Sequence, residues 1–406
     1  MKKIITALVL SICLFGLTSL QAQTLTPAAQ VSLITVSPGE ELYSCFGHSA
    51  LMVRDTTGIM KLYNYGTFDF NDPNFYMNFT RGKLRYMLSV DDLNGILAMA
   101  QYENRSVVQQ MLNLTQAQKQ RLYDFLENNA LPENRFYRYD FFYDNCSSRL
   151  RDALVYACGD ALRFNLKPAT EPKTFRALID PYLENKRWQD LGMDLGLGIP
   201  ADKIATPYQY MFLPDYLKDD FGTATITIDG RKENLVISER TLLPNQPDEA
   251  KTPFFLKPWF AFLLLFMIVF AITYQQYKKQ KEGLWVDAIL FLFTALFGLV
   301  LIFLWFFTDH GVTVNNMNLL WAMPLHFVFI FLLWKKKRQK LVSSYFLAYF
   351  FVLFFLLIFW RFTPQELNAS IIPFLLALAL RSMYIYYRID KDYIRFNGKL
   401  RPKNTL

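Results

Sequence analysis

Histidine and cysteine are scarce in this chain of 406 residues, which contains 3 and 4 of them. Only one histidine, His48, precedes the long apolar runs that begin near residue 254. A zinc site uses three or four histidine, cysteine or carboxylate ligands, and a single histidine argues against such a site. We therefore expect no metal ion and no other cofactor in the front half of the chain.

Two other binding signals are absent. No glycine loop suited to a phosphate occurs, because Gly196-Leu197-Gly198 lacks both a third glycine at the right spacing and a preceding strand. The net charge of +8 does not indicate a nucleic-acid partner: 16 Lys and Arg against 6 Asp and Glu follow residue 275, and the remaining 27 and 29 nearly cancel. The positive charge therefore flanks the apolar runs, where it determines membrane topology.

The second half of the chain consists largely of five apolar runs, near residues 258–276, 286–307, 318–334, 341–360 and 369–387. Each is close to the ~20 residues that cross a bilayer as a helix. Clusters of lysine and arginine follow the first, third and fifth runs, and the other connections carry few positive charges. The positive-inside rule then places the front half outside the inner membrane and the C-terminus in the cytoplasm. We predict an all-α bundle of five transmembrane helices at 257–388 and a basic cytoplasmic tail at 389–406.

The N-terminus is typical of an exported protein. Lys2 and Lys3 precede an apolar run that ends near a small residue, Ala22, which predicts a signal peptide at 1–22. The alternative is an uncleaved N-terminal anchor, which would give the same orientation. Between this leader and the bundle we predict a periplasmic α+β domain at 23–243, with a helical extension and a terminal hairpin. A polar linker at 244–256 follows it.

The strand that carries His48 has a predicted neighbour. A turn signal at 55–58 joins it to a second strand at 61–66. A tight turn would place His48 opposite Tyr65, and a slip of one residue would place Asn64 beside it. The sequence leaves both side chains open as partners of the imidazole.

Cys146 lies in a polar turn at the start of a predicted helix, 147–158. The unpaired N–H groups and partial positive charge of a helix start stabilise a thiolate. A thiolate beside an imidazole is a nucleophile with its base, so we predict Cys146 and His48 as a catalytic pair, with the Cys146 backbone N–H as an oxyanion donor. The alternative is a small buried cysteine and a packed histidine. Three residues could orient the imidazole: Asn64, Tyr65 and Asp69.

The exported chain would keep three cysteines, Cys45, Cys146 and Cys158. An odd number leaves at least one thiol free or paired between chains. If Cys146 is the free thiol, the other two could form a disulfide. A free thiol exposes an exported protein to oxidation, which favours a use for it.

Three motifs are similar to those of a known family: Gly47-His48-Ser49-Ala50, the segment from Tyr63 to Phe70, and the segment from Asp144 to Arg149. The chain resembles the Lnb N-terminal periplasmic domain family over about residues 25–175, and more weakly to about 220. That family in turn resembles circularly permuted papain-like hydrolases of the NlpC-like and lecithin retinol acyltransferase-like kinds. The resemblance implies a permuted papain-like fold with Cys146 as nucleophile and His48 as base. It places the third position on Asn64 or Tyr65.

These observations predict a membrane-tethered cysteine hydrolase or acyltransferase that faces the periplasm. It would act on an amide or ester bond of an envelope component, either a lipid acyl group or a cell-wall peptide. The expected partners are inner-membrane lipids and a lipid or peptidoglycan fragment, with no nucleic acid. The alternative is a non-catalytic binding or assembly module of an envelope membrane complex.

Several polar residues stand at the ends of the apolar runs. Asp287 and Arg381, near the inner ends of the second and last runs, are expected at the membrane interface. A polar group follows the second run and is expected to be a solvated loop, or else the floor of a site shared with the outer domain. Its members are His310, Asn315, Asn316 and Asn318.

Overall fold

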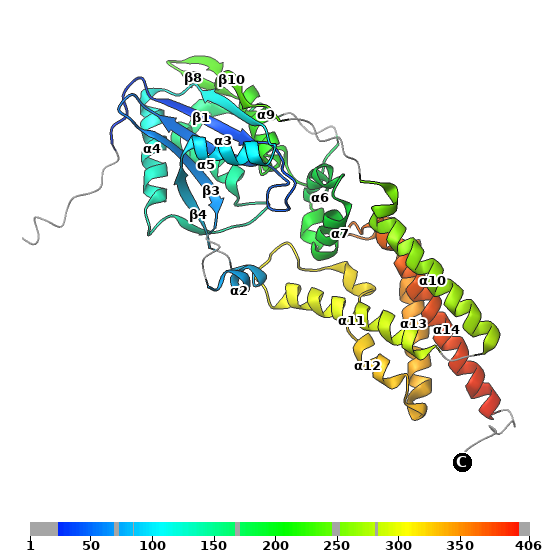
Figure 1. Ribbon diagram of the computed structural model, residues 1–406. Coiled ribbons are helices and arrows are strands. Elements are labelled where there is room, and N and C mark those ends of the chain that lie inside the picture. Colours follow the sequence, from blue (N-terminus) through cyan, green and yellow to red (C-terminus); the bar gives the residue numbers. More distant parts are fainter. Residues whose placement is uncertain are drawn as a thin grey trace, which may run out of the picture. The chain divides into compact units, whose positions relative to one another are not determined.

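The computed structural model describes residues 23–68, 73–83, 85–166, 171–245, 252–280 and 283–397. These residues form two compact units (Figure 1). The sheet unit comprises the chain up to residue 72, 84–170 and 206–247, and the helix unit comprises 73–83, 171–205 and the chain from 248 onward. The predicted signal peptide lies outside the described residues, as does the end of the predicted tail.

A seven-stranded antiparallel sheet, in the order β10-β5-β1-β2-β3-β4-β6, forms the centre of the sheet unit. Its strands are β1 (Gln30–Val36), β2 (His48–Arg54), β3 (Met60–Thr67), β4 (Arg85–Asp91), β5 (Val107–Leu112), β6 (Phe136–Arg138) and β10 (Val236–Leu243). A second, three-stranded sheet contains β7 (Leu162–Arg163), β8 (Thr225–Ile228) and β9 (Arg231–Asn234).

Both faces of the central strands are covered. Successive side chains of a strand point to opposite faces, and neighbours such as Leu33 and Ile34 of β1 lie in different core clusters. One cluster includes residues of α4 (Gln116–Ala130), α5 (Cys146–Cys158) and α9 (Pro214–Thr223), and the other includes residues of α3 (Leu93–Tyr102). This burial explains why the middle of β2, from Ala50 to Val53, is apolar without alternation. The short helix α8 (Pro207–Tyr210) completes the unit.

The hairpin between β2 and β3 differs from the tight-turn prediction. Leu51 pairs with Tyr63, and the Asp55 N–H donates to the Ile59 carbonyl at 2.8 Å, so three residues form the loop. Gly58, at the left-handed φ of 94°, ends this loop. The register is therefore shifted by one residue from the one that would place His48 opposite Tyr65.

Four helices among the described residues are long and apolar enough to cross a membrane. They consist mainly of α10 (Pro258–Lys279), α11 (Leu284–Phe306), α13 (Gln339–Ile358) and α14 (Ile372–Asn397), and the last two spans also include the 3-10 turn before the helix. The predicted run at 318–334 is not one helix, because Pro324 separates a 3-10 turn at Met317–Leu320 from the seven-residue α12 (His326–Leu332). The number of five spans stays a prediction. The unit also contains α2 (Phe75–Thr80), α6 (Phe175–Ile179) and α7 (Arg187–Gly196).

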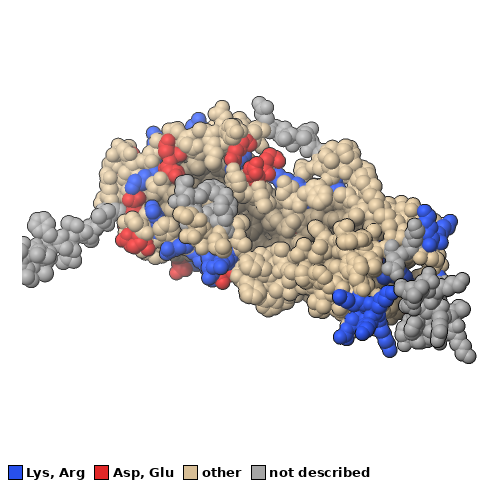
Figure 2. All heavy atoms as spheres, turned by 60° about the horizontal axis from the view of Figure 1, so that its bottom comes forward, with Lys and Arg blue, Asp and Glu red and all other residues tan. Residues whose placement is uncertain are grey.

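Lysine and arginine side chains gather at the end of the membrane helices where α13 begins (Figure 2). They include Lys336, Lys337 and Arg338 of the turn before that helix. Along their length the membrane helices are largely uncharged (Figure 2). This separation of charge from apolar surface is typical of helices whose basic ends face water.

The expected interfacial positions of Asp287 and Arg381 are wrong. Both side chains are fully buried among α10, α11 and α14, and Arg381 Nε donates to Asp287 Oδ1 at 2.6 Å. Arg381 also donates to Thr273 Oγ1 at 2.8 Å and to Gln276 Oε1 at 2.9 Å. Hydrogen bonds and opposite charge offset the cost of burying both groups. The sequence does not show that these helices face one another.

Two of the three asparagines after α11 are buried and hydrogen-bonded rather than solvated, whereas Asn315 is exposed. Asn316 is buried and donates to the carbonyls of Leu195 and Gly196 at 2.8 and 3.1 Å. Asn318 is buried as well and donates to the carbonyls of Asp194 and Leu195, both at 3.3 Å. These bonds attach α7 to the connection after α11. Residues 171–205 thus belong to the helix unit, whereas the sequence analysis grouped them with the predicted periplasmic domain.

Candidate active site

Cys146 occupies the first position of α5, and Asn145 fixes where that helix begins. Asn145 Oδ1 accepts from the Ser148 N–H at 2.9 Å, and Ser148 Oγ accepts from the Asn145 N–H at 2.8 Å. Asn145 Nδ2 donates to the carbonyls of Phe141 and Phe212 at 3.0 and 2.7 Å. This capping box leaves the Cys146 N–H without a partner inside the helix and places the thiol at the positive end of the helix dipole.

His48, the first residue of β2, forms hydrogen bonds on two sides. One joins it to the Cys146 thiol, and the other joins its Nε2 to Asn64 Oδ1. Because an amide oxygen only accepts, Nε2 carries the proton and Nδ1 is the ring nitrogen available to the thiol. The predicted residues Cys146, His48 and Asn64 therefore lie in one chain of hydrogen bonds.

Asp91, at the end of β4, fixes the orientation of the Asn64 amide. Asn64 Nδ2 donates to Asp91 Oδ2 at 3.0 Å, and Ser89 Oγ donates to the same oxygen at 2.6 Å. A carboxylate accepts and does not donate, so the amide oxygen must face His48. Sequence reasoning missed Asp91. Its signal is the pairing of β3 with β4, in which Asn64 lies opposite Ser89.

Tyr65 points away from His48, to the opposite face of β3. Its ring is buried in the core that contains α4 and α5. It packs edge-on against the Tyr137 ring, with the two centroids 6.0 Å apart, and the Arg149 guanidinium carbon lies 5.6 Å from its centroid. These contacts make it a core residue rather than the partner of the imidazole. Asp69, the third candidate, lies outside the described residues.

The two reacting groups favour each other's charged forms. Burial opposes ionisation of Cys146, but the charge of His48, its hydrogen bond and a bond from the Ser49 backbone lower the pKa of the thiol. Burial likewise opposes protonation of His48, whereas the Cys146 thiolate and the bonds to Cys146 and Asn64 raise the pKa of the imidazole. The arrangement stabilises a thiolate–imidazolium pair.

Two glycines allow close packing of the backbone beside Cys146 and His48. Gly66 of β3 has a φ of 88°, and a Cβ added there would lie 3.6 Å from the Cys146 Cβ and 3.5 Å from the Tyr139 ring. Gly47, directly before His48, has a φ of 81°, and an added Cβ would meet the Val36 carbonyl oxygen at 2.9 Å. Both positions are left-handed, a conformation that glycine adopts without strain.

A cavity of about 110 Å³ opens beside Cys146 and His48. Tyr139 lines it and stacks on Tyr86, with the two ring centroids 4.2 Å apart. No aspartate, glutamate, lysine or arginine is among the described residues that line it. Its remaining side chains are mostly aromatic or apolar: Tyr43, Phe46, Phe68, Phe141, Phe212, Leu213 and Pro214.

Two family models match the chain. The Lnb N-terminal periplasmic domain matches residues 18–180, and the Lnb transmembrane domain matches residues 249–392. The chain belongs to the Lnb family. It therefore combines a periplasmic N-terminal domain with a membrane-spanning C-terminal region, as a multi-pass protein of the inner membrane does. No curated protein and no solved structure gave a significant match to the chain.

The other cysteines of this Lnb-family protein are not joined. Cys45 and Cys158 are both buried, and the possible disulfide between them is not formed in the structure. Burial raises the pKa of the Cys158 thiol to about 12. Of the two thiols of α5, only Cys146 adjoins a base.

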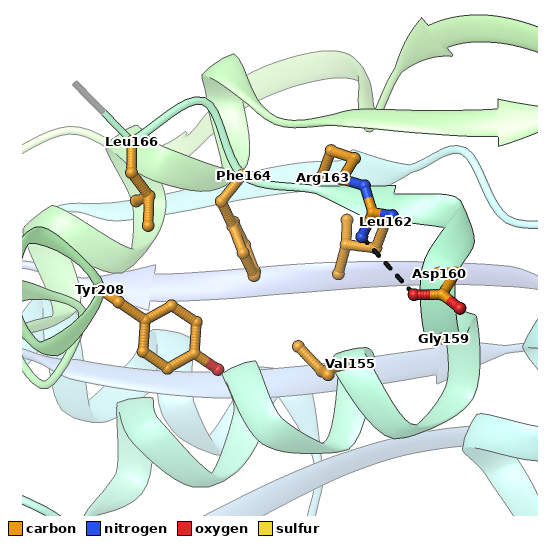
Figure 3. A pocket seen from close by; sticks show the side chains of 8 residues that line it. All are labelled: Val155, Gly159, Asp160, Leu162, Arg163, Phe164, Leu166 and Tyr208. Carbon is orange, nitrogen blue, oxygen red and sulfur yellow. Dashed lines mark ion pairs between the residues drawn. The ribbon is translucent and has the colours of Figure 1, made fainter.

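A second cavity of the sheet unit, of about 460 Å³, lies along the C-terminal half of α5 (Figure 3). Phe164 and Tyr208 flank it, and Asp160 and Arg163 form an exposed ion pair at its rim with a separation of 3.7 Å. Neither a thiol nor an imidazole is among the residues that line it. Although this cavity is larger, its residues offer no nucleophile.

Three carboxylates in the described part of the helix unit have the spacing of a metal site. Oxygens of Asp180, Asp190 and Asp194 all lie within 4.8 Å of one another, beside a cavity of about 980 Å³. Burial and the neighbouring acids raise the pKa of Asp180 to about 7. Arg176 and Asn368 already donate to Asp194. Through Asp194, those bonds join α7 to α6 and to the segment before α14.

Proposed function

We propose that the Lnb-family protein is a cysteine hydrolase or acyltransferase that acts on the periplasmic side of the inner membrane. The observation that carries the proposal is the hydrogen-bonded chain Cys146–His48–Asn64 in a single aromatic cavity. This order of nucleophile, base and orienting amide supports the papain-like assignment. The substrate would be an amide or ester of an envelope component.

In the proposed reaction the Cys146 thiolate adds to the carbonyl carbon of the substrate. The Cys146 N–H at the start of α5 stabilises the oxyanion that forms. The C–O or C–N bond then breaks, the leaving alcohol or amine takes a proton from the His48 imidazolium, and a thioester remains on Cys146. Water, or an amine or alcohol acceptor, attacks this thioester with His48 as base, which releases the acyl group and restores the thiolate.

The lining of the cavity favours a lipid acyl group over a cell-wall peptide. Cell-wall peptides carry free carboxylates and amines, and a site for them needs charged partners. Aromatic side chains such as Phe46, Phe141 and Phe212 instead suit a hydrocarbon chain. We therefore propose inner-membrane lipids as the source of the acyl group.

Contacts within the helix unit support the proposed orientation. Two segments of the helix unit, 73–83 and 171–205, are flanked in sequence by parts of the sheet unit. Both segments form hydrogen bonds with the connection that follows α11. That connection is therefore on the periplasmic side if the sheet unit is. The basic turn before α13 and the C-terminus then belong to the cytoplasmic side, as the positive-inside rule predicts.

The proposal is tested by trapping the thioester. Full-length protein in nanodiscs is incubated with phospholipids and, separately, with peptidoglycan fragments, and the mass of the peptide that contains Cys146 is measured. We expect an acyl adduct from the lipid, with Cys158→Ala behaving as the parent and Cys146→Ala forming none. Absence of any adduct or turnover with both substrates would overturn the enzymatic proposal and favour the alternative, a binding or assembly module.

A further inference from the structure

The short helix α2 belongs to the helix unit although it is inserted between β3 and β4 of the sheet unit. The Asp309 N–H donates to the Arg81 carbonyl at 2.8 Å, and His310 Nε2 donates to the Phe79 carbonyl at 3.2 Å. Gly82 packs closely against the connection that follows α11, because a Cβ added at Gly82 would lie 2.9 Å from the backbone nitrogen of His310. The end of α2 is therefore held beside the end of a membrane-spanning helix (Figure 1).

Large apolar side chains are exposed on both of these helix ends. Met77 of α2 is 55% exposed, and Phe306 and Phe307 at the end of α11 are 65% and 67% exposed. Other apolar residues of α11, among them Phe293 and Val300, also point outward, as they do on a helix that faces lipid. The exposed apolar surface of α2 thus continues the lipid-facing surface of α11.

We propose that α2 lies in the bilayer surface on the periplasmic side, with a phospholipid leaflet as its partner. Met77 and the exposed Phe79 enter the boundary between headgroups and acyl chains, where short amphipathic segments and aromatic rings partition. Arg81 and Lys83, both exposed at the end of α2, then lie at the level of the lipid phosphates. The side of the membrane follows from the sequence, since strands of the periplasmic domain precede and follow α2.

A consequence for the active site rests on the proposed function. Phe68 and Tyr86 line the catalytic cavity, and in sequence they lie five residues before Pro73 and three residues after Lys83. A lipid anchor between these two residues ties the cavity to the membrane through short stretches of chain. That arrangement suits an acyl donor that is drawn from the bilayer rather than from solution.

The depth of α2 is measured without reference to catalysis. Met77→Cys carries a spin label in full-length Cys146→Ala protein in nanodiscs of phosphatidylethanolamine and phosphatidylglycerol. The control is Ile237→Cys, an exposed apolar position of β10 in the sheet unit. We expect the Met77 label to collide several-fold more with oxygen than with a water-soluble nickel complex, and the Ile237 label to show the reverse. A Met77 label that behaves like the control overturns the proposal, and so does one shielded from both reagents, since protein would then cover α2.

The catalytic consequence has its own readout. In Met77→Ser/Phe79→Ser, turnover of a phospholipid in nanodiscs should fall about tenfold, because two apolar side chains no longer stabilise the anchored state. Hydrolysis of a small soluble ester should stay at the parent rate, and Ile237→Ser should leave both rates unchanged. Equal loss with both substrates would overturn the role of α2 in presenting the site to lipid. If even the parent turns over neither substrate, the proposed function fails, while the label measurement still decides where α2 lies.

Discussion

Cys146 and Cys158 stand at opposite ends of α5 and differ in what surrounds their thiols. His48 and the Ser49 backbone lower the pKa of Cys146, whereas burial raises the pKa of Cys158 to about 12. Because the thiolate is the reactive form, Cys146 should react with iodoacetamide at pH 7 at least about 100-fold faster than Cys158. Peptide mass mapping over time measures both rates in one sample. Equal rates would mean that the thiol of Cys146 is not activated.

The pH dependence of turnover follows from the same pair. Ionisation of Cys146, with a pKa lowered from 9.0, should produce an acid limb that rises below pH 9. Loss of the His48 proton, with a pKa raised from 6.5, should produce an alkaline limb that falls above pH 6.5. Turnover should therefore have a bell-shaped pH profile, with the active thiolate–imidazolium form most populated between the two limbs. A rate that increases steadily through pH 9 would contradict this assignment.

Asn64 and Asp91 act on His48 in series, and their variants separate the two roles. Asn64→Ala removes a hydrogen bond that raises the pKa of His48, so the alkaline limb should shift to lower pH and turnover should fall about 100-fold. Asp91→Asn lets the Asn64 amide rotate and should cost about tenfold through poorer alignment of the ring. Profiles of kcat against pH check both, with Tyr65→Phe as the control that leaves the limbs in place.

At the scale of elements, the site was predictable where one short segment determines it. The turn that ends in Cys146 carries its own capping box, so the sequence alone indicates a helix start and an activated thiol. Asn64 and Tyr65 could not be separated, because a one-residue difference in the β2–β3 loop decides which side chain shares a face with His48. The role of Asp91 could not be predicted, because its contact with Asn64 depends on the register between β3 and β4, which meet only in the folded chain.

Gly66 and Gly58 offer a matched pair for the backbone that forms the site. Both have left-handed φ angles, 88° and 94°, so alanine at either position should cost about 1–2 kcal/mol of stability. Only the Gly66 side faces Cys146 and Tyr139, whereas nothing lies within 4 Å of a Cβ at Gly58. We expect similar losses of thermal stability for Gly66→Ala and Gly58→Ala, with turnover reduced in Gly66→Ala alone. Equal turnover rates in the two variants would show that the part of the cavity beside Gly66 does not contact the substrate.

At the scale of the whole molecule, the membrane region was predictable as apolar length and flanking charge, but its internal polar contacts were not. The basic clusters and the apolar runs are local properties of the sequence, and four of the five runs correspond to long helices. The attachment of α7 by Asn316 and Asn318 joins segments about 120 residues apart, as the separation of Asn316 from Leu195 shows. Pairings at that distance leave no periodic signal in either segment.

The buried pair Asp287–Arg381 makes the packing of α10, α11 and α14 testable. Asp287→Asn leaves a guanidinium buried without its counter-charge and should destabilise the protein by about 3–5 kcal/mol, whereas Asp287→Leu/Arg381→Met removes both charges and should restore most of that loss. Thermal unfolding of full-length protein in detergent measures both variants. A double variant no more stable than Asp287→Asn would mean that Thr273 and Gln276, which also accept from Arg381, carry more of the stability than the ion pair does.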